Sequence, residues 1–324
     1  MSLIRPGHPA ARTLVTTLTL TFSLSTAHAC DSCGCHVPSS LDPTVAGFSE
    51  GLFEQYTDFS TLKTDGHRVA NPDHQYMHSS TTQLILGYRA NGWFTVSAFL
   101  PYISRNFSRP DNGPTQHGTV QGLGDTSVIA AARVLRVEQG AAAAAALTLL
   151  AGVKLPTGSP SELAYELNTP DDPDPASATG GHDLALGSGA VDYLAGLSAS
   201  ARFERWFVTA QGTFTYNTRG AYLYRYANEI AANGGLGYYL YAITPWRLTA
   251  QINLSGDSKG LDTVAGARTD DTENHNVYLG GEFATVWQHR LTTDLALDLP
   301  VYEHDSSTQL VPTWRLRAGI DWHF

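Results

Sequence analysis

The chain has 324 residues, of which 42% are hydrophobic and only 15% are charged, well below the roughly 25% charged residues of an ordinary soluble domain. Thirty acidic and 20 basic residues give a net charge of −10, and no basic patch stands out, so we expect no nucleic-acid partner. A 10% share of aromatic residues argues against disorder. Beyond residue 29 no apolar run reaches the roughly 18 residues of a spanning helix, which argues against a helical membrane protein.

Residues 1–29 have the features of a secretory signal peptide. Arg5 and Arg12 form a basic start, Leu14 to Leu24 is an apolar stretch of suitable length, and Ala27-His28-Ala29 is a small-x-small cleavage site. The apolar stretch is too short and too interrupted by threonines for a membrane anchor. We therefore expect an exported mature chain that starts at Cys30. Loss of Arg5 and Arg12 from the 20 basic residues leaves 18 against 30 acidic residues, a net charge of −12.

Most of the mature chain alternates apolar and polar residues with a period of two, which is the pattern of β-strands. The last segment is the clearest: an apolar face with tryptophan near both ends opposes a charged face, as in a lipid-facing barrel strand. Its apolar face comprises Trp314, Leu316, Ala318, Ile320, Trp322 and Phe324, and its other face Arg315, Arg317, Gly319, Asp321 and His323. About twelve segments fit this template: 47–61, 76–90, 93–105, 124–138, 142–155, 186–203, 206–219, 230–242, 246–257, 274–288, 290–303 and 313–324.

The connections between these segments alternate in length. Links after even-numbered segments are short, as at Asn91-Gly92, a hairpin-turn signal, whereas links after odd-numbered segments are long or polar: 62–75, 106–123, 156–185, 220–229, 258–273 and 304–312. This sorting is typical of a membrane barrel with short periplasmic turns and long extracellular loops. Because every backbone polar group needs a partner in lipid, the sheet must close.

The predicted fold class for residues 47–324 is therefore all-β, a closed antiparallel transmembrane β-barrel of about twelve strands in the bacterial outer membrane, surrounded by outer-membrane lipids. An even strand count returns both termini to the periplasm. The terminal Phe324 also resembles bacterial outer-membrane barrels, whose last strand commonly ends in an aromatic residue.

A barrel of about twelve strands has a lumen between the filled interior of small barrels and the open channel of large porins. We expect a narrow passage for a small-molecule permeant, gated by residues 30–46 if this segment folds inward. Polar side chains on the inward faces are expected to set selectivity: Gln83, Arg89, Gln211, Glu282, Asp294, Asp298, Arg315 and Arg317. A shift of one residue in register would turn each of them outward.

Four short motifs resemble a family of outer-membrane barrels known as the "MetA-pathway of phenol degradation" transporters. They are Phe99-Leu100-Pro101-Tyr102, Gly122-Leu123-Gly124-Asp125, Gly152-Val153-Lys154-Leu155-Pro156-Thr157-Gly158 and Leu299-Pro300-Val301-Tyr302. The resemblance implies a barrel that moves small hydrophobic or aromatic compounds, and it supplies no catalytic residues. The three Leu-Pro pairs are expected late in odd-numbered strands, where proline ends pairing near the outer rim.

The N-terminal segment 30–46 departs from that family, because all three cysteines lie together in Cys30-Asp31-Ser32-Cys33-Gly34-Cys35-His36. Cys30, Cys33, Cys35 and His36 are candidate ligands for a soft metal ion such as Cu(I) or Zn(II), and the segment could dock a periplasmic partner. A disulfide with one leftover thiol is an alternative in an oxidising periplasm. Lipidation of Cys30 is a third, disfavoured because Ala27 stands where a lipobox prefers Leu.

Catalysis is the weaker hypothesis. Asp294 and Asp298 lie four apart on one strand face and could form an acid–base pair, but solvated lumen side chains explain them better. A lipid hydrolase lacks its nucleophile-elbow motif, and Ser188 is interpreted as a small residue at a strand start. The acidic segment 159–185 lacks calcium-loop spacing and is interpreted as a solvated loop. We therefore predict a non-enzymatic channel or transporter for passive passage of small molecules, with an outer-membrane lipid hydrolase and a metal-handling or electron-conduit barrel as alternatives.

Overall fold

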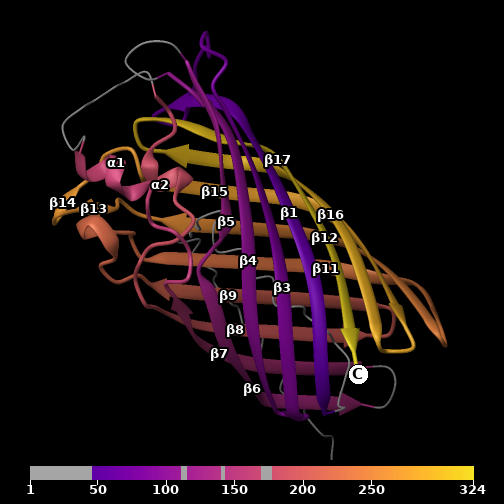
Figure 1. Ribbon diagram of the computed structural model, residues 1–324. Helices are drawn as coiled ribbons and strands as arrows, with labels where there is room; N and C mark the ends of the chain where they lie inside the picture. Colours follow the sequence, from indigo (N-terminus) through magenta and orange to yellow (C-terminus); the bar gives the residue numbers. More distant parts are fainter. Residues whose placement is uncertain (1–45, 111–114, 140–142, 169–176) are drawn as a thin grey trace, which may run out of the picture.

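The protein is described here by a computed structural model that covers residues 46–110, 115–139, 143–168 and 177–324. Twelve antiparallel strands form the ring of the barrel: β1 (Gly47–Thr64), β3 (Tyr76–Asn91), β4 (Phe94–Arg109), β6 (Thr126–Gln139), β7 (Ala143–Leu155), β8 (Asp192–Phe203), β9 (Trp206–Tyr216), β11 (Glu229–Ile243), β12 (Trp246–Lys259), β15 (Asn274–Trp287), β16 (Leu291–Asp305) and β17 (Thr308–His323). Each pairs with its neighbours, and β17 pairs with β1 to close the ring (Figure 1).

Short elements decorate this ring. The small strands are β2 (His67–Arg68), β5 (Gln116–Leu123), β10 (Tyr224–Arg225), β13 (Thr263–Val264) and β14 (Ala267–Arg268), and the helices are α1 (Leu163–Asn168), α2 (Gly181–Leu184) and the 3-10 turn η2 (Ala221–Leu223). Within the described residues, no helix is long and apolar enough to span a membrane. The predicted fold class is confirmed, and each of the twelve expected segments overlaps one ring strand.

The outward face is apolar, as the alternation predicts. In β16 the side chains of Leu295, Leu297 and Leu299 are 54%, 48% and 52% exposed, whereas Ala296 and Asp298 between them are 1% and 0% exposed. Aromatic rings border this apolar face: Trp206 packs on Tyr238 and Trp287 packs on both Trp246 and Trp322 near the short turns, while Tyr56 packs on Trp314 farther out. An apolar band between two aromatic girdles is the surface that a bilayer requires.

Three connections differ from the sequence-based expectation. Residues 116–123, expected in a loop, form β5, which pairs with the outer half of β4. The turn between β16 and β17 is also short, because both strands continue past the predicted ends and leave only residues 306–307 between them. Finally, the strand expected from residue 186 begins only at Asp192, and the acidic link before it contains α1 and α2. Hydrophobic patterning missed β5 because its outward face is largely polar.

The Leu-Pro pairs explain where strand pairing changes. At Pro101, in the middle of β4, the neighbouring strand switches from β6, whose last partner is Phe99, to β5, whose first partner is Tyr102. Proline lacks the N–H that a continuous ladder would need there. Pro156 follows the end of β7, and β16 no longer pairs with β17 beyond Asp298, just before Pro300. Pairing therefore ends at Pro156 as expected. At Pro300 only the pairing with β17 ends, because β16 remains paired with β15 up to Asp305, and β4 continues through Pro101.

The interior of the barrel has two different walls. One wall carries the hydrophobic cluster of the inward-facing side chains Phe53, Ile85, Phe99, Ile129, Leu150 and Leu194, which come from six successive strands, β1, β3, β4, β6, β7 and β8. Inward positions of β9, β12, β15, β16 and β17 are mostly polar, among them Thr209, Asn253 and Asp298. The register of all ring strands places these two surfaces inside the barrel.

Candidate functional site

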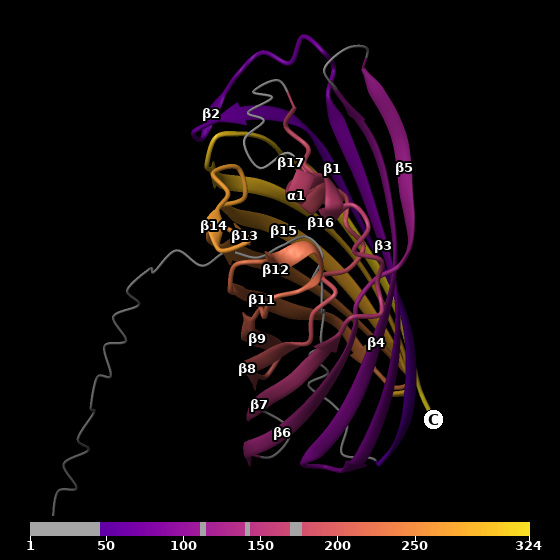
Figure 2. The same cartoon turned by 60° about the vertical axis from the view of Figure 1, so that its left-hand side comes forward.

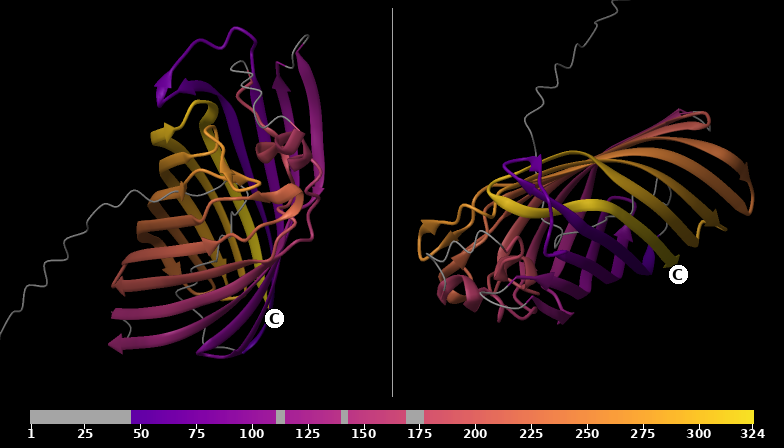
Figure 3. Two further views of the ribbon diagram at one scale, coloured as in Figure 1. Left: turned by 90° about the vertical axis from the view of Figure 1, so that its left-hand side faces the viewer. Right: turned by 90° about the horizontal axis from the view of Figure 1, so that it is seen from above.

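The connection between β7 and β8, residues 156–191, is called here the mouth loop; its described residues are 156–168 and 177–191. It carries α1 and α2, which lie at the end of the barrel opposite the short turns and the C-terminus (Figure 1). Seen from the side, both helices lie between the strands β3 to β5 and the segments β13 and β14 (Figure 2; Figure 3, left). The mouth loop therefore narrows the entrance that faces away from the short turns.

Asp125, in the break between β5 and β6, fixes both ends of the mouth loop. One carboxylate oxygen accepts a hydrogen bond from the N–H of Gly158 (3.0 Å), and the other accepts from the N–H (2.9 Å) and the hydroxyl (3.0 Å) of Ser188. Gly158 and Gly187 lie so close together that an added Cβ at either would overlap the opposite backbone. Only glycine allows this approach.

Thr157 completes the base of the loop. Its hydroxyl donates to the carbonyl of Gly124 (2.8 Å) and accepts from the N–H of Thr126 (2.8 Å). Two of the motifs that carry the family resemblance, residues 122–125 and 152–158, thus meet here. Both motifs stand out in the sequence, but nothing in it indicates that they contact each other, because the contacting residues are 33 positions apart.

Two arginines of β4 hold the middle of the mouth loop against the barrel wall. Nη1 of Arg105, whose side chain is buried, donates to the carbonyls of Asp183 (2.5 Å) and Ala185 (2.9 Å). Nη1 of Arg109 donates to the carbonyl of Thr179 (3.1 Å), and its guanidinium lies 4.8 Å from the ring centre of Tyr165. Neither arginine was among the predicted site residues: Arg109 lies beyond the predicted strand end at residue 105, and Arg105 is the last residue of that predicted strand.

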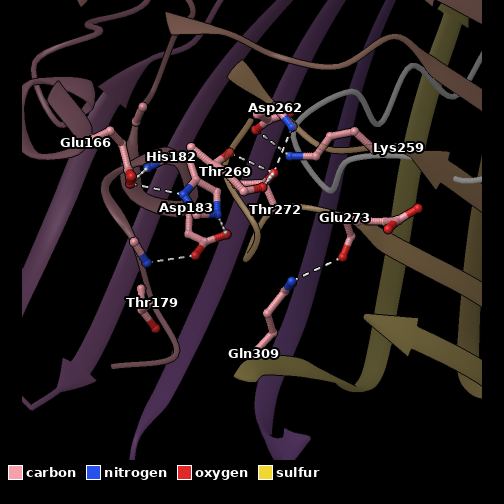
Figure 4. Close-up of polar contacts among 12 residues, drawn as sticks. Glu166, Thr179, His182, Asp183, Lys259, Asp262, Thr269, Thr272, Glu273 and Gln309 are labelled. Carbon is pink, nitrogen blue, oxygen red and sulfur yellow. Dashed lines mark hydrogen bonds and ion pairs between the residues drawn. The ribbon is translucent and has the colours of Figure 1, made fainter. Parts of the chain in front are cut away.

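A buried ion pair joins the two helices of the loop. Nδ1 of His182 lies 3.0 Å from Oε1 of Glu166, and its Nε2 lies 3.4 Å from Oδ1 of Asp183 (Figure 4). Burial opposes the charge on the imidazole, but the carboxylates of Asp183 and Glu166 outweigh it and raise the pKa of His182 to about 10. Burial likewise opposes the charge on Glu166, yet His182 and its hydrogen bonds lower the pKa of Glu166 to about 2.

Apolar contacts seat the loop from both sides. Leu184 is fully buried against Phe59, Met77 and Phe107 of β1, β3 and β4. On the opposite side Leu163 and Ala185 pack on Tyr224 and Val264 of β10 and β13. The Tyr224 hydroxyl donates to Asp262 (2.5 Å), which also pairs with Lys259 (2.9 Å; Figure 4). The loop is therefore packed as part of the core, which differs from the solvated loop expected from its acidic composition.

The residues predicted to line the lumen lie at different places inside the ring. Asp298 is fully buried between Arg315 (3.1 Å) and Arg317 (2.8 Å). Glu282 accepts from Asn253 (2.8 Å), and Nε of Arg89 lies 3.3 Å from the Thr95 hydroxyl. Gln83 is buried on β3, while Gln211 and Asp294 are partly buried on β9 and β16. The structure thus brings Asp298, Arg315 and Arg317 together, and it places Gln83 and Asp294 with Arg317 around one cavity of the interior.

The remaining predicted sites can be placed only in part. Cys30, Cys33, Cys35 and His36 lie outside the described residues. Within the residues that are described, no cluster of histidine, cysteine, aspartate and glutamate could hold a metal ion. Ser188 precedes β8 instead of starting it, and its hydroxyl bonds to the carboxylate of Asp125. Its position is explained by anchoring of the mouth loop.

The fold is similar to that of known outer-membrane proteins. The COG4313 outer membrane channel from Pseudomonas putida F1 matches with a TM-score of 0.64 at 15% sequence identity, over 89% of this chain and 99% of that chain. The β domain of the Bordetella autotransporter Brka matches with a TM-score of 0.46 at 14% identity, over 86% and 100%. A FadL homologue of Pseudomonas aeruginosa matches with a TM-score of 0.32 at 10% identity, over 86% and 90%.

No protein-family model matches the sequence, and no curated protein matches it. At 15% identity the likeness to the Pseudomonas putida channel concerns the fold. Together with the apolar band and its aromatic girdles, it identifies the chain as a barrel of the bacterial outer-membrane type, as predicted.

Proposed function

We propose that this protein is an outer-membrane channel for passive passage of small molecules, and that compounds with an apolar or aromatic part are among its permeants. The observation that carries the proposal is the two-sided interior beneath a narrowed mouth. An inert structural barrel would need neither a loop anchored in its entrance nor chemically distinct inner walls.

The apolar wall suits a hydrocarbon or aromatic group. Its six side chains form a continuous cluster and are each no more than 9% exposed. A hydrocarbon or aromatic group that packs against this cluster would bury its own apolar surface, which is favourable in proportion to the apolar area removed from water.

The polar wall supplies fixed hydrogen-bonding groups. Arg315 and Arg317 share the carboxylate of Asp298, and Arg315 also donates to the Ser255 hydroxyl (2.9 Å) and lies 4.0 Å from the ring centre of Tyr278. Because the arginines are held in place, they can orient a polar substituent without first reorganising. A small molecule with one apolar face and one polar group would complement both walls.

The comparisons with known proteins also support a channel function. The Pseudomonas putida protein that shares the fold is described as an outer membrane channel, and the resemblance of the Leu-Pro and Gly-Asp motifs implies transport of hydrophobic or aromatic compounds. That this chain belongs to the transporter family named in the sequence analysis is likewise part of this proposal.

The test uses two adjacent leucines of β7. Leu150 points inward and is 5% exposed, whereas Leu149 points outward and is 48% exposed. We expect wild-type protein to conduct in planar bilayers, Leu150→Trp to reduce conductance severely, and Leu149→Trp to leave it unchanged. Heat-dependent migration of the barrel on gels verifies that each variant is folded. Absence of conductance in wild type, or equal conductance in both folded variants, would contradict the proposal.

A further inference from the structure

A polar cavity lies between the mouth loop and the inner wall formed by β12, β15, β16 and β17. Thr179, His182 and Asp183 line it from the loop, and Asp257, Asn276 and Asp305 line it from the wall. We propose that this cavity binds the protonated amino group of a small amphipathic amine before the amine enters the channel. The proposal rests on the proposed channel function and names one class of permeant.

Unpartnered polar atoms converge on this cavity. Oγ1 of Thr179, Oδ1 of Asn274, Oδ1 of Asn276 and Oδ2 of Asp305 are buried without a hydrogen-bond partner among the described residues. Thr179, Asn276 and Asp305 are only 2%, 6% and 3% exposed. A buried polar atom without a partner costs about 1 to 3 kcal/mol, so several in one cavity require a hydrogen-bonding occupant, either water or a ligand that displaces it. Because carboxylate and amide oxygens only accept hydrogen bonds, that ligand must donate them.

The charges around the cavity favour a cation. Its positive groups have partners already: His182 pairs with Glu166, Lys259 with Asp262 (2.9 Å), and Arg105 with two carbonyls. Asp305 makes no ion pair or side-chain hydrogen bond with any other described residue, and its Oδ2 atom is buried without a hydrogen-bond partner. Lys63 acts on Asp305 from a distance but is already paired with Glu303 (2.8 Å), and burial raises the pKa of Asp305 to about 7. A buried carboxylate with so little compensating charge is unfavourable, and an ammonium group would supply both the charge and three donors.

The rest of the lining indicates an organic cation instead of a metal ion. Phe59, Met77, Leu310, Pro312 and Tyr278 face the same cavity. These side chains offer carbon and aromatic surface to the remainder of the ligand, and an aromatic ring also attracts a nearby cation. A metal site would use several carboxylates or imidazoles together, and the described residues hold no such cluster.

Binding to the mature protein in detergent provides the test, with benzylammonium chloride as the probe and isothermal titration calorimetry as the measurement. Benzyl alcohol is a neutral probe of similar shape, benzoate an anionic one, and calcium chloride tests for a metal site. We expect benzylammonium to bind, benzyl alcohol to bind more weakly and benzoate not to bind. Asp305→Asn should weaken benzylammonium at least tenfold, since a hydrogen bond between two charged groups becomes one to a neutral amide.

Asp270→Asn is the matched control, because Asp270 is an exposed carboxylate of the same outer end and does not line the cavity. It should leave the affinity unchanged. Thr179→Val provides a second variant that removes an unpartnered hydroxyl without changing the charge or the shape of the side chain, and it should also weaken binding. No benzylammonium binding, equal binding of the amine and the alcohol, calcium binding in place of the amine, or an unaffected Asp305→Asn would overturn the inference. Conductance is measured separately, so a conducting protein without amine affinity would refute this inference and leave the channel intact.

Discussion

Substitution of Asp125 by alanine tests whether the mouth loop is held in the barrel by its base. The change removes all three hydrogen bonds from Gly158 and Ser188 to the carboxylate. Each is worth about 1 to 1.5 kcal/mol net, since Asp125 is partly exposed, so docking of the loop should lose about 3 to 4.5 kcal/mol. At about 1.4 kcal/mol for each factor of ten, the undocked population rises roughly 100- to 1,000-fold.

Two measurements report this change. Limited proteolysis of the mouth loop in folded barrels should accelerate in Asp125→Ala, because cleavage follows the population of the open form. Single-channel recordings should show higher conductance or frequent fluctuations. Asp270→Ala, which removes an exposed carboxylate of the outer loops, is the control and should behave like wild type. If folded Asp125→Ala matches wild type in both measurements, the mouth loop is held by other contacts and the reasoning is wrong.

Three further predictions follow from the same structure. The pKa of Glu166 is lowered from 4.5 to about 2, so its stabilisation of the loop is lost as the pH falls through this range. The pKa of His182 is raised from 6.5 to about 10, so its stabilisation of the loop is lost as the pH rises through that range. Protease resistance of the loop should therefore be greatest between these ranges, and His182→Gln should abolish the alkaline loss; a pH-independent wild type would contradict this. Asp298→Asn removes the carboxylate that pairs with both Arg315 and Arg317, so reversal potentials should shift towards anion permeation, whereas Asp270→Asn should not shift them. The segment Cys30–His36 predicts stoichiometric copper or zinc in protein purified under reducing conditions; a metal-free protein that yields one free thiol per chain when not reduced would favour the disulfide alternative.

The barrel could be predicted from sequence because its main physical requirement is local. Each lipid-facing side chain must be apolar whatever its neighbours are, so Leu295, Leu297 and Leu299 reveal both the strand and its orientation without knowledge of any partner strand. The same independence explains why the alternation gave twelve segments close to the observed ring strands. Patterning was less informative at β5, because its exposed residues Gln116, His117, Thr119 and Gln121 are polar and leave no apolar alternation to detect.

The mouth loop could not be predicted in this way, because its contacts depend on residues far apart in the chain. Arg105 and Asp183 are separated by 78 residues, and Asp125 and Ser188 by 63. An acidic segment with prolines has the composition of a solvated loop. Nothing in that composition reveals that arginines of β4 will donate hydrogen bonds to its carbonyls. Glycines 158 and 187 were the available signal, since glycine is required where two backbones approach closely.

The anchored loop and the proposed amine site must be energetically coupled, since Thr179 and Asp183 belong to the loop while Asn276 and Asp305 belong to the wall. A ligand that contacts both sides binds the docked form more tightly than the undocked form, and it therefore stabilises docking. The coupling is reciprocal. Benzylammonium should slow proteolysis of the mouth loop, and Asp125→Ala, which lies outside the cavity, should weaken benzylammonium binding once the undocked form becomes the major one. If the probe binds Asp125→Ala as tightly as wild type although the loop is cleaved readily, the loop contributes nothing to the site, and only the wall residues hold the amine.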